Sequence, residues 1–227
     1  MLKIREESGE IKDFDAVLFD MDGVLTDNLG FHRASWAACL REDYGLSIDA
    51  DDPRLHAGLV REILPQVTGL RLSLEETEAF RERKEARYRD LARGALTPVP
   101  GLAAYLAWLA DRGVRYGLVT GSDPVCIDFV LTELDLRTRF AVRVTGNDVD
   151  HGKPHPEAYL RAIAALGVAA ASCLVHEDSA AGVASALAAG AQVAALATTL
   201  PEAALRPTGA RWIVRDFQAW LGIVEAS

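Results

Sequence analysis

The sequence predicts an α/β protein with a doubly wound, mainly parallel sheet and a small all-helical domain inserted near its start. Short apolar runs bounded by turn residues alternate with helix-like segments, which is the pattern of a parallel sheet covered by helices on both faces. One stretch, residues 29–97, interrupts this alternation. Polar residues follow three of the apolar runs, where open α/β sheets bind their ligands.

The apolar runs predict the strands of a Rossmann-like sheet. Each run is short and apolar throughout, as expected of a strand buried on both faces. The predicted strands lie within residues 15–20, 114–122, 140–146, 172–179 and 191–198. Helix-like segments lie between them, and three of the four reach a glycine near their expected end. These predicted helices lie within residues 101–113, 123–136, 155–167 and 180–190.

The interrupting stretch predicts a separate helical domain. Residues 29–97 contain no convincing strand, and their most charged part, SLEETEAFRERKEARYRDLARG, is expected to form a helix with a solvated charged face. The segment LTPVPG, residues 96–101, is typical of a stiff linker back to the sheet. We therefore expect residues 1–28 and 98–227 to form the Rossmann-like core and residues 29–97 an inserted helical domain.

The composition argues against two classes of binding partner, nucleic acids and membranes. The formal net charge of −9 provides no basic surface for nucleic acid or for an anionic membrane. No apolar stretch is long enough to span a bilayer, and residues 1–10 lack the apolar run of a secretory signal. Three scattered cysteines suit free thiols in a reducing compartment. We expect a cytoplasmic protein without a nucleic-acid or membrane partner. The sequence does not determine the oligomeric state, and a monomer is favoured.

Acidic and hydroxyl side chains follow the predicted strands. Since the carboxyl ends of parallel strands meet at one edge of the sheet, these side chains are expected to lie together. They are Asp20 and Asp22 after the first strand, Thr120, Gly121 and Ser122 after the second, and Glu177 and Asp178 after the fourth, with Lys153 supplied by the segment GKPHPE. Each segment alone is typical of a turn, a loop or a helix cap. Their ordered appearance at successive strand ends favours a site.

The charges of this site predict a metal ion. Four ionised carboxylates and the single ammonium of Lys153 would leave three uncompensated negative charges near one point. Like charges at such separations raise the pKa of some of the acids unless a cation intervenes. Oxygen ligands suit Mg²⁺ rather than a soft metal, and Mg²⁺ together with a protonated Asp22 would bring the total to zero. The sequence therefore predicts a Mg²⁺ site.

These segments resemble the haloacid dehalogenase superfamily of phosphotransferases. DMDGVL is similar to the first motif of that family, VTGS to the second, HGKPHPE to the third and HEDSAAG to the fourth. The resemblance covers residues 14 to about 200, and residues 29–97 take the place of the family's helical C1 cap. It implies a hydrolase with a catalytic core and a cap domain.

The resemblance also implies a covalent mechanism. Asp20 would attack phosphorus in line and form an aspartyl-phosphate. Asp22, its pKa raised by the crowded acids, would protonate the leaving oxygen and later deprotonate the attacking water. Thr120 and Lys153 would hold the transferring phosphoryl oxygens, since catalysis of this kind rests on positioning and charge stabilisation.

The same resemblance assigns the ligands of metal and phosphate. Mg²⁺ would be bound by the carboxylates of Asp20 and Asp178 and by the backbone carbonyl of Asp22. Glu177 would either bind the ion directly or contact one of its ligands. Among the residues expected to bind phosphate or substrate, Gly23 would let the backbone turn sharply past the phosphate. The others are Gly121, Ser122, His32 and Arg61.

The fourth motif and two features of residues 29–97 concern the substrate. The EDS form of the fourth motif resembles the branch that holds small sugar-phosphate phosphatases and β-phosphoglucomutase. His32 followed by Trp36, and Arg61 three residues after Gly58, resemble mutase features, with Arg61 in the place of an arginine that grips a distal phosphate. Asn28 and the VTGS segment depart from the mutase pattern, in which Thr or Ser and an Ala-Ser form are usual.

We therefore expect a Mg²⁺-dependent phosphatase that hydrolyses a small, sugar-phosphate-like metabolite through an aspartyl-phosphate. The alternative is a β-phosphoglucomutase-like phosphomutase. A non-catalytic phospholigand-binding protein would not need the full acidic set, and haloacid dehalogenation would need neither a metal nor Asp22.

Overall fold

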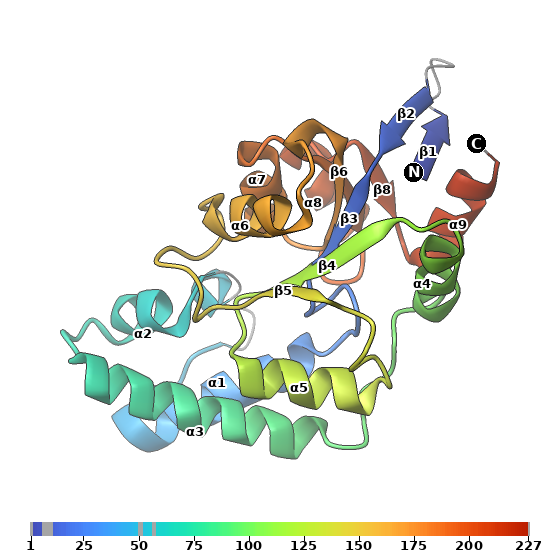
Figure 1. Cartoon of the computed structure of the whole chain (residues 1–227). Coiled ribbons are helices and arrows are strands. Elements are labelled where there is room, and N and C mark those ends of the chain that lie inside the picture. Colours follow the sequence, from blue (N-terminus) through green and yellow to red (C-terminus); the bar gives the residue numbers. More distant parts are fainter. Residues whose placement is uncertain (1, 6–10, 50–51, 56–57, 227) are drawn as a thin grey trace.

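The computed structural model describes residues 2–5, 11–49, 52–55 and 58–226. Its central sheet has six parallel strands in the order β5-β4-β3-β6-β7-β8 (Figure 1). They are β3 (Ala16–Phe19), β4 (Arg115–Val119), β5 (Val142–Val144), β6 (Cys173–Glu177), β7 (Gln192–Leu196) and β8 (Trp212–Val214). The chain builds outward from β3 to one edge and then to the other, which is the doubly wound order. The predicted fold class is confirmed.

Two parts of the β structure were not predicted. An antiparallel hairpin of β1 (Leu2–Arg5) and β2 (Ile11–Phe14) leads directly into β3, and β8 adds the last strand of the sheet. Leu2, Ile4 and Phe14 are buried in the same cluster as Phe217 and Trp220 near the end of the chain. Each strand has only three or four residues, too few for its alternation of apolar and polar side chains to stand out.

Helices cover both faces of the sheet. One face packs against α4 (Leu102–Asp111), α5 (Pro124–Glu133) and α9 (Phe217–Glu225). The other packs against α6 (Glu157–Leu166), α7 (Ala180–Ala188) and the short α8 (Glu202–Leu205). Alternate residues of β3 serve the two faces, because Val17 and Phe19 belong to the first cluster and Ala16 and Leu18 to the second.

Three further helices follow β3 before the chain returns to the sheet. They are α1 (Leu29–Tyr44), α2 (Val60–Thr68) and α3 (Leu74–Ala92), and they lie together beyond one end of the sheet (Figure 1). They enclose a small apolar cluster of their own that includes Trp36, Leu64 and Phe80. Ser73 and Glu76 exchange hydrogen bonds at the start of α3, a capping box that fixes where this helix begins.

The segments that enter and leave this helical insertion are bonded to each other. The Thr26 hydroxyl donates to the Thr97 carbonyl at 2.7 Å, and the Val99 amide donates to the Leu25 carbonyl at 2.9 Å. The chain therefore leaves the sheet and returns to it at one place. Within the described ranges, every helix is too short or too polar to cross a membrane.

Candidate active site

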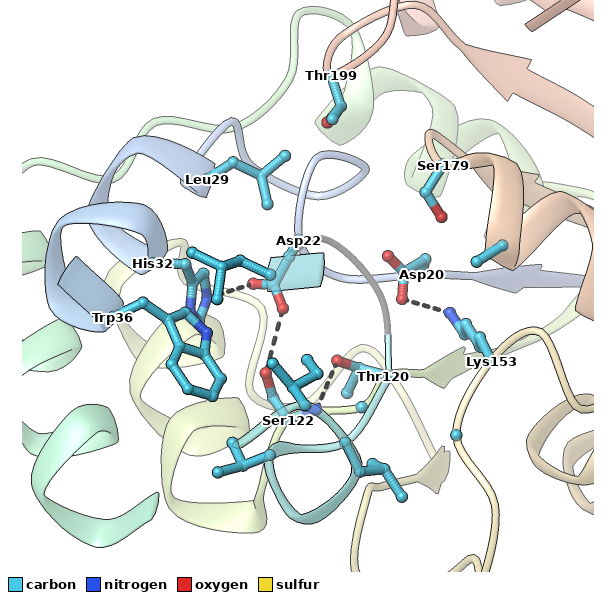
Figure 2. A pocket seen from close by; sticks show the side chains of 18 of the residues that line it. Asp20, Asp22, Leu29, His32, Trp36, Thr120, Ser122, Lys153, Ser179 and Thr199 are labelled. Atoms are coloured by element: carbon cyan, nitrogen blue, oxygen red, sulfur yellow. Dashed lines mark hydrogen bonds and ion pairs between the residues drawn. The ribbon is translucent and has the colours of Figure 1, made fainter. Parts of the chain in front are cut away.

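The predicted residues meet at the carboxyl end of the central strands. Asp20 directly follows β3, Thr120 follows β4, and Glu177 is the last residue of β6. Because β3 pairs with β4 on one side and with β6 on the other, these residues come to one edge, where Figure 2 shows Asp20 and Thr120. Asp20 is held in line with the sheet, since its amide donates to the His176 carbonyl at 3.0 Å.

Lys153 reaches this edge from the loop before α6. Its Nζ donates to Asp20 Oδ1 at 2.7 Å, to Glu177 Oε1 at 2.6 Å and to the Val119 carbonyl at 3.2 Å. Burial works to lower the pKa of Lys153, but the charges of Asp20 and Glu177 outweigh burial and raise that pKa above its ordinary value. The ammonium is therefore fixed beside the Asp20 carboxylate.

Three carboxylates form a cluster that fits a divalent cation. Oxygen atoms of Asp20, Glu177 and Asp178 lie within 4.8 Å of one another, and all three residues are buried. Burial raises the pKa of Asp20 to about 7, with the charges of Glu177 and Asp22 adding to the effect and Lys153 opposing it. Burial and the same kind of repulsion raise the pKa of Asp178. A hard cation with oxygen ligands would offset this excess negative charge.

Glu177 is the most firmly held member of the cluster. Besides the bond from Lys153, it accepts the Tyr159 hydroxyl at 2.7 Å, the Ser179 hydroxyl at 3.1 Å and the Asp178 amide at 3.1 Å. Gly182 on α7 packs directly on it, because a Cβ added at Gly182 would lie 1.9 Å from the Glu177 carboxyl carbon. The roles of Tyr159 and Gly182 were not predicted, since neither residue stands at a strand end.

This contact predicts the effect of one methyl group. Gly182→Ala is expected to displace the Glu177 carboxylate, with a loss of activity of about 10–100-fold, as for other residues that orient metal ligands. Gly222→Ala on α9 is the matched control, because a Cβ there meets nothing within 4 Å and alanine favours a helix. Steady-state rates and thermal melts of both variants test this. Equal activity of the two variants would contradict it.

Gly23 and Thr199 contact the carboxylate cluster from the other side. Gly23 has a φ of +80°, and a Cβ on it would lie 1.9 Å from Asp178 Oδ2, so a glycine is required there. The Thr199 hydroxyl donates to the same carboxylate oxygen, and the Thr198 hydroxyl donates to the Gly23 carbonyl at 2.6 Å. The two threonines were not predicted, although Thr198 ends the fifth predicted strand and Thr199 follows it.

Asp22 does not join the carboxylate cluster. Its side chain turns toward the helical insertion, where Asn28 Nδ2 lies 2.6 Å and His32 Nε2 3.2 Å from Oδ1, and the Ser122 hydroxyl donates to Oδ2 at 3.1 Å. Burial works to raise the pKa of Asp22, but interaction with His32, hydrogen bonds from His32 and Asn28, and the charge of Lys84 lower it to about 2. The expectation of a pKa raised by crowded acids was wrong, because the side chain faces donors.

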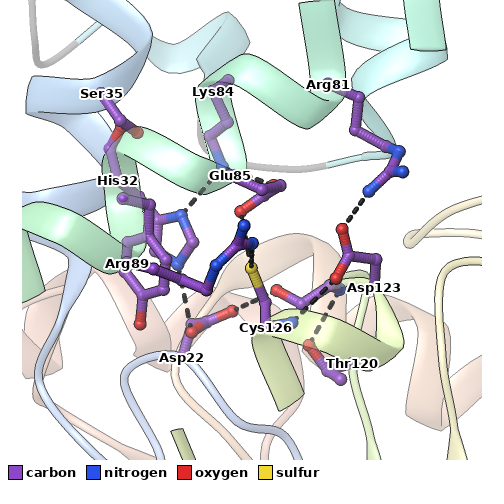
Figure 3. A network of polar contacts seen from close by, with 12 residues as sticks. Asp22, His32, Ser35, Arg81, Lys84, Glu85, Arg89, Thr120, Asp123 and Cys126 are labelled. Carbon is purple, nitrogen blue, oxygen red and sulfur yellow. Dashed lines mark hydrogen bonds and ion pairs between the residues drawn. The ribbon is translucent and has the colours of Figure 1, made fainter. Parts of the chain in front are cut away.

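A buried polar network continues from Asp22 into α3 (Figure 3). Lys84 Nζ lies 2.9 Å from His32 Nδ1 and 2.8 Å from Glu85 Oε1. Because an ammonium group can only donate, His32 Nδ1 accepts and Nε2 carries the hydrogen that faces Asp22. Glu85 also accepts the Cys126 thiol of α5 at 3.1 Å.

This network corrects the prediction of a solvated charged face for part of α3, although Glu78, Glu82 and Arg83 are exposed as expected. Lys84 and Glu85 are only 3% and 4% exposed. The segment RERKEARYR gave no sign of this, because charged residues dominate it and nothing local reveals that α3 packs against α5.

A cavity of about 380 Å³ opens between the acidic edge and the helical insertion. Thr120, Gly121 and Ser122 line it on the sheet side, and His32 and Trp36 line it on the helical side. Arg61 is not among its described lining residues. The Arg61 guanidinium instead donates to the carbonyls of Val149 and Asp150 in the loop that carries Lys153.

Comparisons with known proteins agree with this site. Residues 14–190 match the family model described as haloacid dehalogenase-like hydrolase. The chain is 32% identical over 177 residues to the phosphorylated carbohydrates phosphatase of Thermotoga maritima, covering 78% of this chain and 82% of that one. It is 29% identical over 178 residues to the fructose-1-phosphate phosphatase YqaB of Escherichia coli, covering 78% and 93%.

A solved structure of a candidate β-phosphoglucomutase from Bacteroides vulgatus is also similar. It superposes with a TM-score of 0.81 at 27% identity and covers 94% of this chain and 90% of that one. The family match extends over most of the chain and includes all four motifs. Strands β7 and β8, at one side of the sheet, lie beyond the matched residues. The chain belongs to the haloacid dehalogenase-like hydrolases.

Proposed function

We propose that this protein is a Mg²⁺-dependent phosphatase that hydrolyses a small, sugar-phosphate-like metabolite through an aspartyl-phosphate on Asp20. One observation carries the proposal: a buried carboxylate, Asp20, is bonded to Lys153 and grouped with Glu177 and Asp178 at the edge of a cavity of about 380 Å³. A carboxylate attacks a phosphate only where positive charge neutralises both groups. Lys153 supplies one positive charge, and the cluster is suited to hold a divalent cation that would supply the rest.

In this proposal Asp20 is the nucleophile. Its Oδ1 accepts from Lys153, and the ammonium would also balance charge on the transferring phosphoryl group. The Thr120 hydroxyl accepts from the Ser122 amide at 3.1 Å and remains free to donate to a phosphoryl oxygen. Asp20, Glu177 and Asp178 would hold Mg²⁺, which when bound would neutralise charge on the phosphate oxygens.

Asp22 would act as the acid and base. It is ionised in this structure, which suits the step in which it takes a proton from the attacking water. For the preceding step it must hold a proton, and a phosphate dianion bound beside it would raise its pKa by repulsion. The bonds from Asn28 and His32 fix its orientation.

A sugar phosphate is the proposed substrate class. Two relatives are named for phosphorylated carbohydrates and for fructose 1-phosphate. The cavity is of the size that takes a single small metabolite. The position of Arg61 favours a phosphatase over a mutase, because its guanidinium bonds to backbone carbonyls instead of facing the cavity. A mutase would need a cation in the cavity for its second phosphate, and Arg61 does not supply one, whereas Arg33 and Lys84 line the cavity.

We therefore expect the protein to release inorganic phosphate from small phosphate monoesters without a bisphosphate activator. A phosphate-release screen over sugar and nucleotide monophosphates, run with Mg²⁺, checks this. Conversion of β-glucose 1-phosphate to glucose 6-phosphate that requires a bisphosphate primer would favour the phosphomutase instead. Binding of these compounds without turnover would favour a non-catalytic protein.

A further inference from the structure

The start of α2 contacts the loop that carries Lys153. This loop, residues 145–156, connects β5 to α6. Arg61 Nη2 donates to the Val149 carbonyl at 2.6 Å and to the Asp150 carbonyl at 3.0 Å, and Nη1 lies 3.5 Å from the Gly146 carbonyl. One guanidinium thus reaches three carbonyls of a loop more than eighty residues away in the sequence.

Glu62 makes a second connection to the same loop. Its Oε1 accepts the Gly152 amide at 3.0 Å, and its Oε2 accepts the Leu59 amide at 2.8 Å. The Glu62 carboxylate therefore caps the start of α2 and binds the loop at once. Its negative charge also lies in the first turn of α2, where the helix dipole favours it.

Leu59 adds an apolar contact to the connections made by Arg61 and Glu62. It is 4% exposed and belongs to the apolar cluster of the sheet, together with Val119 and Val144, although it precedes a helix of the insertion. The loop accommodates these groups because it has glycine where they pack. A Cβ on Gly152 would lie 2.6 Å from Glu62 Oε2 and 3.0 Å from Leu59 Cγ.

We propose that Leu59, Arg61 and Glu62 form a clasp that holds the helical insertion on the loop of Lys153. Arg61 and Glu62 are then positioning residues for Lys153, and Arg61 is not a ligand of a second phosphate. Gly152, which bonds to Glu62, directly precedes Lys153, whose Nζ lies 2.7 Å from Asp20. A loop released by the clasp would move the ammonium relative to the nucleophile. This inference rests on the proposed function of Lys153.

Paired substitutions separate a clasp from a phosphate site. Arg61→Ala and Glu62→Ala each remove one connection, and a carboxylate such as Glu62 repels a phosphate. The matched control is Arg87→Ala, because the Arg87 guanidinium bonds to Glu42 within the insertion. The substrates are fructose 1-phosphate and fructose 1,6-bisphosphate, which differ by one phosphate.

We expect both clasp variants to lose about three- to tenfold in kcat on either substrate, the size expected when one or two hydrogen bonds to an exposed group are lost. Amide hydrogen exchange in residues 146–152 should be faster in both variants and unchanged in Arg87→Ala. The double variant should lose less than the product of the two single losses, because the connections act as one unit. Arg61→Lys, which can still donate to carbonyls, should recover part of the protection.

Two results would overturn the clasp. Unchanged exchange in residues 146–152 in both variants would show that they do not hold the loop. An effect of Arg61→Ala confined to the bisphosphate, with Glu62→Ala normal, would make Arg61 a ligand of the second phosphate. The exchange measurement does not depend on turnover. A wild type inactive on all phosphate esters would therefore refute the proposed function, and the exchange rates of residues 146–152 would still decide whether the clasp holds the loop.

Discussion

Asp20→Asn is expected to abolish turnover, with a fall in kcat of at least about 10³-fold, while the protein stays folded. The asparagine amide has nearly the shape of the carboxylate but cannot attack phosphorus. Its effect on stability should be small or favourable, because it removes one negative charge from a cluster of three buried carboxylates, two of which accept from Lys153. Glu177 remains to pair with the ammonium.

Single-turnover and steady-state assays, together with thermal melts, test this expectation. Asp27→Asn is a suitable control, because Asp27 is exposed and lies seven residues further along the same segment. Mass spectrometry of the assayed sample excludes deamidation of the new asparagine back to aspartate. Residual activity within tenfold of wild type would remove Asp20 from the role of nucleophile.

Asp178→Ala is expected to weaken Mg²⁺ binding and activity together, each by more than about 100-fold. The variant removes one of three clustered carboxylates, and a hard cation depends on such oxygens for affinity. Removing residues that merely orient a ligand already lowers metal affinity by about 10–100-fold, so loss of a ligand should exceed that range. EDTA should silence the wild type, and added Mg²⁺ should restore it.

Thermal melts provide a measurement that does not depend on turnover. At a concentration 100 times its Kd, Mg²⁺ should stabilise the folded wild type by about 2.7 kcal/mol and so raise the midpoint temperature of its unfolding. The midpoint of Asp178→Ala should stay nearly unchanged. Full activity of the wild type in excess EDTA would instead favour metal-free chemistry such as dehalogenation.

The sheet and its acidic edge could be predicted because their signals are local. A buried parallel strand is an uninterrupted apolar run, and topology alone brings the residues after such runs together. For this reason Asp20, Thr120, Lys153 and Glu177 were expected at one place, and they lie there.

The interface between the insertion and the sheet could not be predicted in the same way. Whether Lys84 is solvated or buried depends on the packing of α3 against α5. The sequence of α3 alone does not reveal which helix packs against it. Likewise, the side chain of Arg61 has several possible partners, and only the position of the loop at residues 145–156 decides among them. Asp22 shows the same limit, because its neighbours Asn28 and His32 set its pKa.

The hydrogen bonds between the segments at Thr26 and Thr97 have a consequence for how such an enzyme can diversify. Because the two ends of the insertion are already paired, replacing it by a longer, shorter or differently folded module leaves the spacing of the sheet unchanged. The entropy of closing the intervening chain grows only slowly with its length. The chain between these two ends can therefore vary in length and fold, as long as it keeps groups such as Arg61 and Glu62 in contact with the loop that carries Lys153.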